Sequence, residues 1–257
     1  MTAPLLEAQA VNKRFGGLDA LCDVSLTIAR GEIYGLIGPN GAGKTTFFNV
    51  LSGLYRPDGG AFRIDGGALP QGAPHAVAAA GIARTFQNIR LFGNMSALDN
   101  VMVGRHVRMH AGILGAILRL RSERDEEAAT RVRAQALLEY VGLGPRAGQL
   151  ARHLPYGDQR RLEIARALAT EPKLLALDEP AAGMNAAETR DLRALLERIR
   201  ADGVTLLLIE HDVQLVMGLC DRVCVLDYGR KLAEGPPAEV RRDPRVIEAY
   251  LGTPATA

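Results

Sequence analysis

One stretch of the sequence combines glycines, a lysine and threonines at a spacing suited to holding a chain of phosphates. Residues Gly38-Pro39-Asn40-Gly41-Ala42-Gly43-Lys44-Thr45-Thr46 fit the pattern G-x-x-x-x-G-K-[ST] at every position. Glycines let backbone N–H groups curve around an anion, and the positive end of a following helix would point at the same place. We expect Lys44 to reach the β- and γ-phosphates and the Thr45 hydroxyl to bind Mg²⁺. The stretch predicts binding of a nucleoside triphosphate.

The residues on either side have the context that such a loop needs. The apolar run 33–37 before it predicts a strand, and residues 46–51 after it predict a helix. A chance glycine-rich turn is the alternative, and it would not require both flanks. We therefore favour the phosphate loop.

A pair of carboxylates closes a second apolar run. Asp178 and Glu179 follow residues 174–177, which have the continuous apolar character of a strand buried on both faces of a parallel sheet. Ligands of parallel sheets bind at the carboxyl ends of the strands, and Mg²⁺ prefers hard oxygen ligands. We expect Asp178 to hold the metal, directly or through water, and Glu179 to polarise the attacking water. The alternative is a surface acidic pair before Pro180, which the intact phosphate loop disfavours.

Three further side chains are candidates for the same site. His211 follows the apolar run 204–209, which places it at the same sheet edge as Gly43 and Asp178, where a sensor of the γ-phosphate would stand. A lone histidine is more often structural. Gln87 ends an earlier predicted strand and could reach the metal. Phe15 lies at a predicted loop tip, where a plain hydrophobic anchor is the alternative interpretation.

Composition limits the class of protein. The 257 residues are 47% apolar and 23% charged, which is typical of a globular chain long enough for one large α/β domain. The net charge of +2 comes without a Lys/Arg cluster, so we expect no nucleic-acid partner. The three cysteines lack zinc-ligand spacing, which predicts reduced thiols, with Cys224 buried. No signal peptide is evident and no apolar run reaches about 18 residues, so we expect any role at a membrane to depend on a partner.

The remaining pattern predicts the elements that carry these residues. Residues 5–30 alternate between apolar and polar positions around Gly16-Gly17, which predicts antiparallel strands joined by a turn. Strands are also predicted at 61–66, up to Gln87, at 204–209 and at 223–226, and helices at 159–169 and 188–200.

Residues 95–154 have a helical texture and predict an α-helical insertion in the α/β core. Within it, 113–118 are apolar, 119–133 carry charges of both signs typical of a solvated helix face, and 142–145 form a Gly/Pro break. The tail from Pro254 is expected to be frayed.

With these residues placed, nearly the whole chain resembles the ATP-binding subunit of ABC transporters. The phosphate loop, Gln87 as the Q-loop glutamine, Asp178-Glu179 as Walker B with the catalytic glutamate, and His211 as the switch histidine come in that family's order. Phe15 matches the aromatic residue that stacks on adenine. The family's signature, most often Leu-Ser-Gly-Gly-Gln, appears here as Leu154-Pro155-Tyr156-Gly157-Asp158.

This resemblance implies a set of roles for individual residues. Catalysis would involve Glu179, His211 and Lys44, and the metal would be held by Thr45, Gln87 and Asp178. ATP would contact Phe15, Gly38, Pro39, Asn40, Gly41, Ala42, Gly43, Lys44, Thr45, Thr46 and Gln87 of one subunit, and Leu154, Tyr156, Gly157 and Asp158 of the opposite subunit. The working unit would be a head-to-tail dimer with two ATP molecules at its interface, formed with a second copy or with a related ATPase.

Particular segments resemble a subfamily, the ATPases of branched-chain amino acid importers, and the larger of their two ATPase subunits most of all. These segments are 84–88, 156–166, 179–185, 209–212 and Ala249-Tyr250-Leu251-Gly252. Pro155 and Asn185 depart from the serine and aspartate that many ABC proteins carry there. Without the serine hydroxyl, we expect backbone N–H groups, including that of Gly157, to engage the phosphate.

The resemblance implies one α/β domain with a P-loop NTPase core, an N-terminal antiparallel β subdomain and an inserted α-helical subdomain. The core would span 1–87 and 156–240, the helical subdomain 88–155, and a C-terminal helix and tail 241–257. The protein would be an ATPase using ATP and Mg²⁺ at the cytoplasmic face of the plasma membrane. It would attach through two permease subunits, with a solute-binding protein as an indirect partner.

Several alternatives stay open at this point. The solute could be an amide or urea instead of a branched-chain amino acid, and transport could be export. A soluble ABC ATPase acting on DNA or ribosomes usually has a coiled-coil insertion or tandem cassettes, which this chain lacks. Pro155 and Asn185 raise the further alternative of a cassette that binds nucleotide without hydrolysing it.

Overall fold

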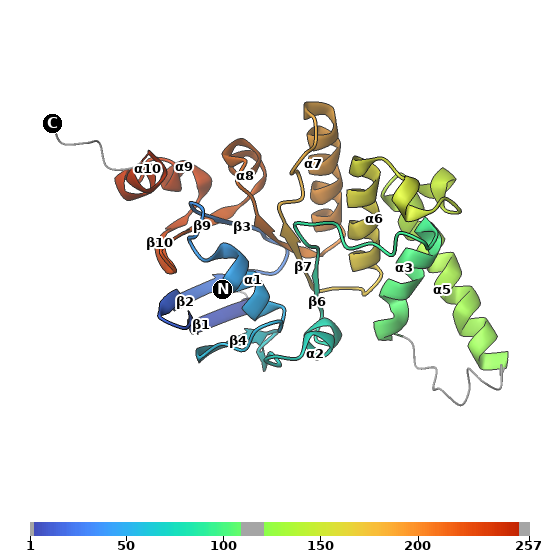
Figure 1. Ribbon diagram of the computed structural model, residues 1–257, viewed down its shortest axis with the longest axis horizontal. Coiled ribbons are helices and arrows are strands. Elements are labelled where there is room, and N and C mark those ends of the chain that lie inside the picture. Colours follow the sequence, from blue (N-terminus) through green and yellow to red (C-terminus); the bar gives the residue numbers. More distant parts are fainter. Residues whose placement is uncertain (1–2, 109–120, 252–257) are drawn as a thin grey trace.

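The computed structural model describes residues 3–108 and 121–251. A six-stranded sheet lies at the centre, with a four-stranded sheet below it and helices above and to one side (Figure 1). The predicted apolar segment 113–118 and the tail from Pro254 lie outside the described residues.

The central sheet has the order β10-β9-β3-β8-β7-β6. Its strands are β3 (Ile33–Ile37), β6 (Ile82–Arg84), β7 (Leu174–Asp178), β8 (Thr205–Ile209), β9 (Arg222–Asp227) and β10 (Arg230–Gly235). All neighbours pair in parallel except β10, which is antiparallel to β9. Every residue of β3, β7 and β8 is buried, which confirms the predicted buried strands.

The strand predicted to reach Gln87 is shorter than expected. β6 ends at Arg84, and although the Thr85 N–H still donates to the Ala176 carbonyl at 2.9 Å, Gln87 lies in the following loop. The chain leaves the sheet here because the backbone of residues 86 and 87 bonds to the side chain of Arg160 instead of to a strand.

The second sheet is antiparallel, in the order β2-β1-β4-β5, and confirms the prediction for residues 5–30. It contains β1 (Leu6–Phe15), β2 (Leu18–Ile28), β4 (Gly59–Ile64) and β5 (Gly67–Ala68). Helix α1 (Lys44–Leu51) shares one hydrophobic cluster with both sheets, in which Phe47 packs edge-on against Phe62 at 5.5 Å. Helix α2 (Pro74–Ala79) precedes β6.

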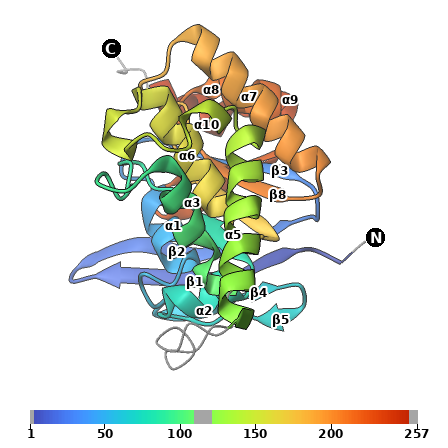
Figure 2. The same cartoon turned by 90° about the vertical axis from the view of Figure 1, so that its right-hand side faces the viewer.

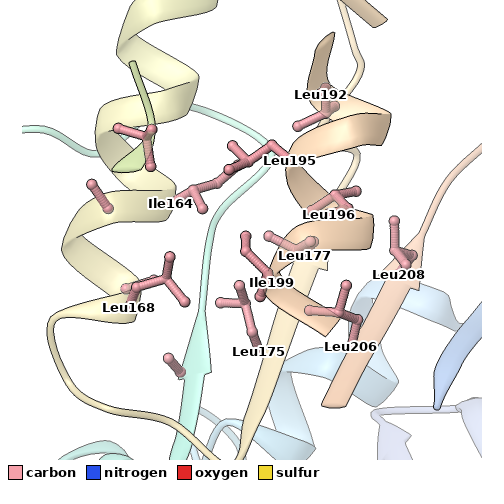
Figure 3. Close-up of a cluster of buried hydrophobic side chains, with 14 of the residues drawn as sticks. Ile164, Leu168, Leu175, Leu177, Leu192, Leu195, Leu196, Ile199, Leu206 and Leu208 are labelled. Carbon is pink, nitrogen blue, oxygen red and sulfur yellow. The ribbon is translucent and has the colours of Figure 1, made fainter. Parts of the chain in front are cut away.

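The other face of the central sheet is covered by α6 (Tyr156–Leu168), α7 (Ala186–Ala201) and α8 (Val213–Leu219). Figure 3 shows leucine and isoleucine side chains of α6 and α7 meeting those of β7 and β8. Residues along β7 alternate between clusters, with Leu175 and Leu177 on this face and Leu174 and Ala176 on the other. The short helices α9 (Pro237–Val240) and α10 (Pro244–Leu251) lie beside the β10 end of the sheet (Figure 1).

A helical region forms the opposite end of the molecule. It contains α3 (Ala97–Arg105), α5 (Arg121–Tyr140) and the 3₁₀ turns η1 (His106–Arg108), η2 (Gly144–Arg146) and η3 (Ala151–His153). Helix α5 runs alongside α3 and α6 (Figure 2). Residues 125–133 are mostly exposed, which confirms a solvated helix face there. Among the described helices, none combines the length and apolar character needed to cross a bilayer.

Candidate active site

The carboxyl ends of three neighbouring strands bring the predicted site together. The phosphate loop follows β3, Asp178 and Glu179 end β7, and His211 follows β8, which pairs with both other strands. An open groove of about 420 Å³ runs along this edge. Its lining consists of Phe15, Leu18, Asp19, Ala20, Asn40, Gly41, Ala42, Gly43, Lys44, Thr45, Thr46, Gln87, Glu179 and Tyr228.

The phosphate loop depends on glycine at two crowded positions. Gly38 has φ of 151°, and a Cβ there would lie 2.1 Å from the Leu226 carbonyl oxygen. Gly43 has φ of 101°, and a Cβ there would lie 2.6 Å from the Ala20 carbonyl oxygen. Gly43 is also the N-cap of α1, and no side chain caps this helix. Its first N–H groups therefore have no side-chain partner and are available to a ligand in the groove.

Lys44 lies within this loop. Its ammonium group donates to the carbonyls of Gly38 and Pro39 at 2.6 and 2.9 Å. Burial lowers the pKa of Lys44, while the nearby Glu179 and Asp178 carboxylates oppose that shift. The sheet edge thus places a cation between the loop and the two acidic side chains.

Asp178 is held by a buried arginine that the sequence did not single out. The Arg84 guanidinium contacts the Asp178 carboxylate at 2.9 Å, and both side chains are less than 10% exposed. Arg84 also donates to Asn49 Oδ1 of α1 at 2.7 Å and to Oγ of Ser52, the residue that follows α1, at 3.0 Å. Burial raises the pKa of Asp178, and Arg84 acts against that rise. One guanidinium therefore joins β6, β7 and the phosphate-loop helix.

Glu179 is in a different environment. Its φ is +48°, a region that non-glycine residues seldom adopt, and its N–H donates to the Ile209 carbonyl at 2.9 Å. Its carboxylate accepts a hydrogen bond from Gln87 Nε2 at 2.9 Å and lies 3.6 Å from His211 Nδ1. Gln87, Glu179 and His211 therefore form one cluster at the groove, and His211 is 65% exposed.

The residues predicted to hold a metal fit Mg²⁺ by their donor chemistry. They offer a threonine hydroxyl, a glutamine amide and one carboxylate, all hard oxygen donors. Within the described part of the chain, no cluster of three His, Cys, Asp or Glu side chains could hold a metal by itself. This set suits a cation that keeps waters and phosphate oxygens among its ligands, which is the usual behaviour of Mg²⁺.

The predicted signature residues do not line this groove. Leu154 is buried, and Tyr156, Gly157 and Asp158 form the first turn of α6 behind Pro155. Asp158 pairs with Arg146 at 2.5 Å. Asn185 caps α7, and its side chain accepts hydrogen bonds from the N–H groups of residues 187 and 188. Asparagine suits a helix cap as well as the aspartate that many ABC proteins carry here.

A second buried arginine connects α6 to the loop that carries Gln87. Arg160 donates to the carbonyls of Phe86, at 2.7 Å, and Gln87. It also contacts Glu163 of its own helix, at 3.3 Å, and donates to the Tyr156 hydroxyl at 3.0 Å. An Arg and a Glu three positions apart within an otherwise apolar helix face are a signal that can be read from the sequence, but no functional role was predicted for either.

Comparisons with known proteins agree with this geometry. The family model described as ABC transporter matches residues 21–182, and that described as branched-chain amino acid ATP-binding cassette transporter matches 230–256. The high-affinity branched-chain amino acid transport ATP-binding protein BraF of Pseudomonas aeruginosa is 46% identical over 254 residues, covering 98% of this chain and 99% of BraF. LivG of Escherichia coli strain K12, which carries the same description, matches with the same identity and coverage.

A solved structure shares the fold. A nucleotide-free ATP-binding cassette from an ABC transporter superposes with a TM-score of 0.85 at 30% identity, covering 98% of this chain and all of that one. This likeness, together with the two sheets of this chain, confirms the predicted α/β architecture. The chain therefore belongs to the ABC transporter family of ATP-binding cassettes, as its motifs predicted.

Proposed function

We propose that this chain hydrolyses ATP to drive uptake of branched-chain amino acids through membrane permease partners. The observation that carries the solute class is the 46% identity, over nearly the full length of both chains, to proteins named for high-affinity branched-chain amino acid transport. The match of residues 230–256 to the family model described as branched-chain amino acid ATP-binding cassette transporter supports the same solute class.

The groove accounts for nucleotide binding. The N–H groups of the phosphate loop and the start of α1 bind the phosphate chain, and Lys44 turns its ammonium group from the loop carbonyls to the β- and γ-phosphates. Thr45, Gln87 and Asp178 would hold Mg²⁺, which would supply positive charge against the phosphate oxygens. Phe15 packs edge-on against Tyr55 at 5.3 Å and offers a ring to the adenine.

The cluster beside the phosphate loop accounts for hydrolysis. Glu179 orients the attacking water and accepts its proton, and the Gln87 side chain, which donates to its carboxylate at 2.9 Å, helps to position it. His211 senses the γ-phosphate from the end of β8. Lys44 offsets the charge that develops during phosphoryl transfer.

Dimerisation completes the site. Residues 154–158 lie at the start of α6 and do not line the groove of their own chain, and we propose that they cover the nucleotide of a second ATPase subunit. We divide the chain accordingly into a core of 1–87 and 156–240, a helical subdomain of 88–155 and a C-terminal helix and tail of 241–257.

A second groove gives the permease a place to dock. It has a volume of about 320 Å³ and lies between α2, β6, α3 and α6, with Phe86, Phe92, Val103 and Val107 among its lining residues. Phe86 immediately precedes Gln87, so a helix seated in this groove would act on the residue that contacts Glu179. We propose that attachment there holds the chain at the cytoplasmic face of the plasma membrane.

The test is affinity purification of the tagged chain from gently solubilised membranes of its host, followed by uptake of labelled leucine in cells with and without the chain. We expect recovery of two multi-span permease subunits and a related ATPase, and loss of uptake with a Lys44→Ala variant. A purely soluble eluate, or leucine uptake that does not depend on the chain, would refute the transport assignment.

A further inference from the structure

An exposed tyrosine stands at the groove without a role in the function proposed above. Tyr228 is 85% exposed, more than any other large hydrophobic side chain in the described part of the chain. It lines the groove together with the phosphate loop, and besides Phe15 it is the one aromatic residue that does so among the described residues. Burial in a core does not explain this ring.

The backbone does not explain it either. Tyr228 and Gly229 form a two-residue turn between β9 and β10, whose ends pair through Asp227 and Arg230. Both central residues have positive φ, +43° and +76°, which is the type I′ geometry that favours Asn-Gly. A tyrosine is a strained choice at such a position, and strain of this kind is a recurrent feature of functional sites.

The turn is fixed against the phosphate loop. The Gly229 N–H donates to the Ala42 carbonyl at 3.0 Å, and the Gly229 carbonyl accepts from the Cys22 N–H at 2.8 Å. A Cβ on Gly229 would lie 2.7 Å from the Ala20 carbonyl oxygen, so the turn lies close against β2 as well. The position of Tyr228 relative to the phosphate loop is therefore set by backbone contacts.

We infer that Tyr228 contacts the nucleoside part of the bound nucleotide and supplies a second aromatic surface besides Phe15. The inference rests on the proposed binding of ATP. When the phosphate loop fixes the phosphates, the base and ribose extend along the groove past Ala20 and Leu18, the same part of the groove that the turn of Tyr228 borders. An aromatic ring that is exposed to water gains by covering a base or a sugar, and any base can stack on such a ring because every base has a π-face.

With this role, replacing Tyr228 should weaken the binding of ATP without lowering the stability of the fold. Asparagine suits positive φ better than tyrosine does, so Tyr228→Asn removes the ring and relieves the turn at the same time. A purely structural tyrosine would instead lower the unfolding midpoint on replacement.

The experiment compares two ligands on the full chain by isothermal titration calorimetry. ATP carries the nucleoside, whereas inorganic tripolyphosphate presents phosphates alone. We expect Tyr228→Asn to raise the Kd for ATP by about five-fold or more, to leave the Kd for tripolyphosphate unchanged, and not to lower the midpoint of urea unfolding. Tyr228→Phe keeps the ring and should bind ATP within about two-fold of the wild type.

Other outcomes separate the inference from the function on which it rests. Equal ATP affinity of the wild type and Tyr228→Asn would overturn the inference, as would an equal loss of affinity for both ligands, since the latter means a distorted phosphate loop. Loss of ATP affinity only at concentrations where sedimentation shows dimers would assign Tyr228 to the subunit interface and also overturn it. A wild-type chain that binds neither ligand would refute the proposed nucleotide site itself. Lys44→Ala, which should weaken both ligands, is the matched control.

Discussion

Asp178 and Glu179 are neighbours in the sequence, yet their side chains differ in burial and in the residues that they contact. The Asp178 side chain is 4% exposed and is paired with Arg84, which is itself bonded to Asn49 of α1 and to Ser52, the residue after that helix. The Glu179 side chain is 20% exposed, and its carboxylate contacts the exposed side chains of Gln87 and His211. One carboxylate is anchored in the core, and the other belongs to a cluster of side chains that can rearrange.

The difference fits the separate roles that we propose for Asp178 as a metal ligand and for Glu179 as the base. A carboxylate that holds a metal benefits from a fixed position, because misplacement of a ligand is costly to catalysis. A carboxylate that orients water must respond to the nucleotide and to closure of the site, which a surface cluster permits. We therefore expect substitutions of the residues that anchor Asp178 to change the stability of the fold. Substitutions of Glu179 and its partners should instead change the rate of ATP turnover.

The largest effect should come from Glu179→Gln. Loss of a general base typically costs about 10²- to 10⁴-fold in rate, while the isosteric amide keeps the shape of the groove. Steady-state phosphate release should fall by at least about 100-fold, with ATP binding retained. Glu197→Gln, on the exposed face of α7, is the control. Hydrolysis within a few-fold of the wild type would remove Glu179 from the role of base.

Arg84→Met should have the largest effect on stability. It leaves the buried Asp178 carboxylate without its cation, which typically costs about 3–5 kcal/mol in the free energy of unfolding. Urea denaturation measures this loss. Replacing Asp178 by Asn in the same chain should recover part of it, because the uncompensated charge is then absent. A loss no larger than that of Arg193→Met, which breaks an exposed pair on α7, would contradict an anchored Asp178.

Thr85→Val tests a smaller part of the same anchor. The buried Thr85 hydroxyl accepts a hydrogen bond from the Asp178 N–H at 3.3 Å, and valine leaves that N–H unsatisfied. We expect a loss of about 1–3 kcal/mol in the free energy of unfolding. Thr189→Val, at an exposed position of α7, serves as the matched control. Equal unfolding midpoints for the two variants would show that this hydrogen bond contributes nothing.

Gln87→Ala should have the smallest effect on stability, because Gln87 is exposed and loses one exposed hydrogen bond to Glu179. We expect a change within about 0.5 kcal/mol, and a several-fold lower steady-state ATPase rate. If the variant instead unfolded as readily as Arg84→Met, the distinction between an anchored and a rearranging carboxylate would not hold.

Much of this site could be predicted because its signals are local. The phosphate loop needs glycines at fixed offsets from a lysine, and the buried strands show as continuous apolar runs, so both were placed correctly from neighbouring residues. The end of β6 was not, because it depends on Arg160, which takes the backbone groups of residues 86 and 87 away from the sheet.

The sequence by itself determined the order of the motifs, the sheet edge at which they meet and the family to which the chain belongs. The tertiary structure alone decided which partners far apart in the sequence bind the two buried arginines. Arg84 and Asp178 are separated by 94 positions, and Arg160 and Gln87 by 73. Such pairs form only where the register of β6 against β7 and the packing of α6 bring them together. Local periodicity reports on neighbours within a few residues and therefore carries no information about these partners.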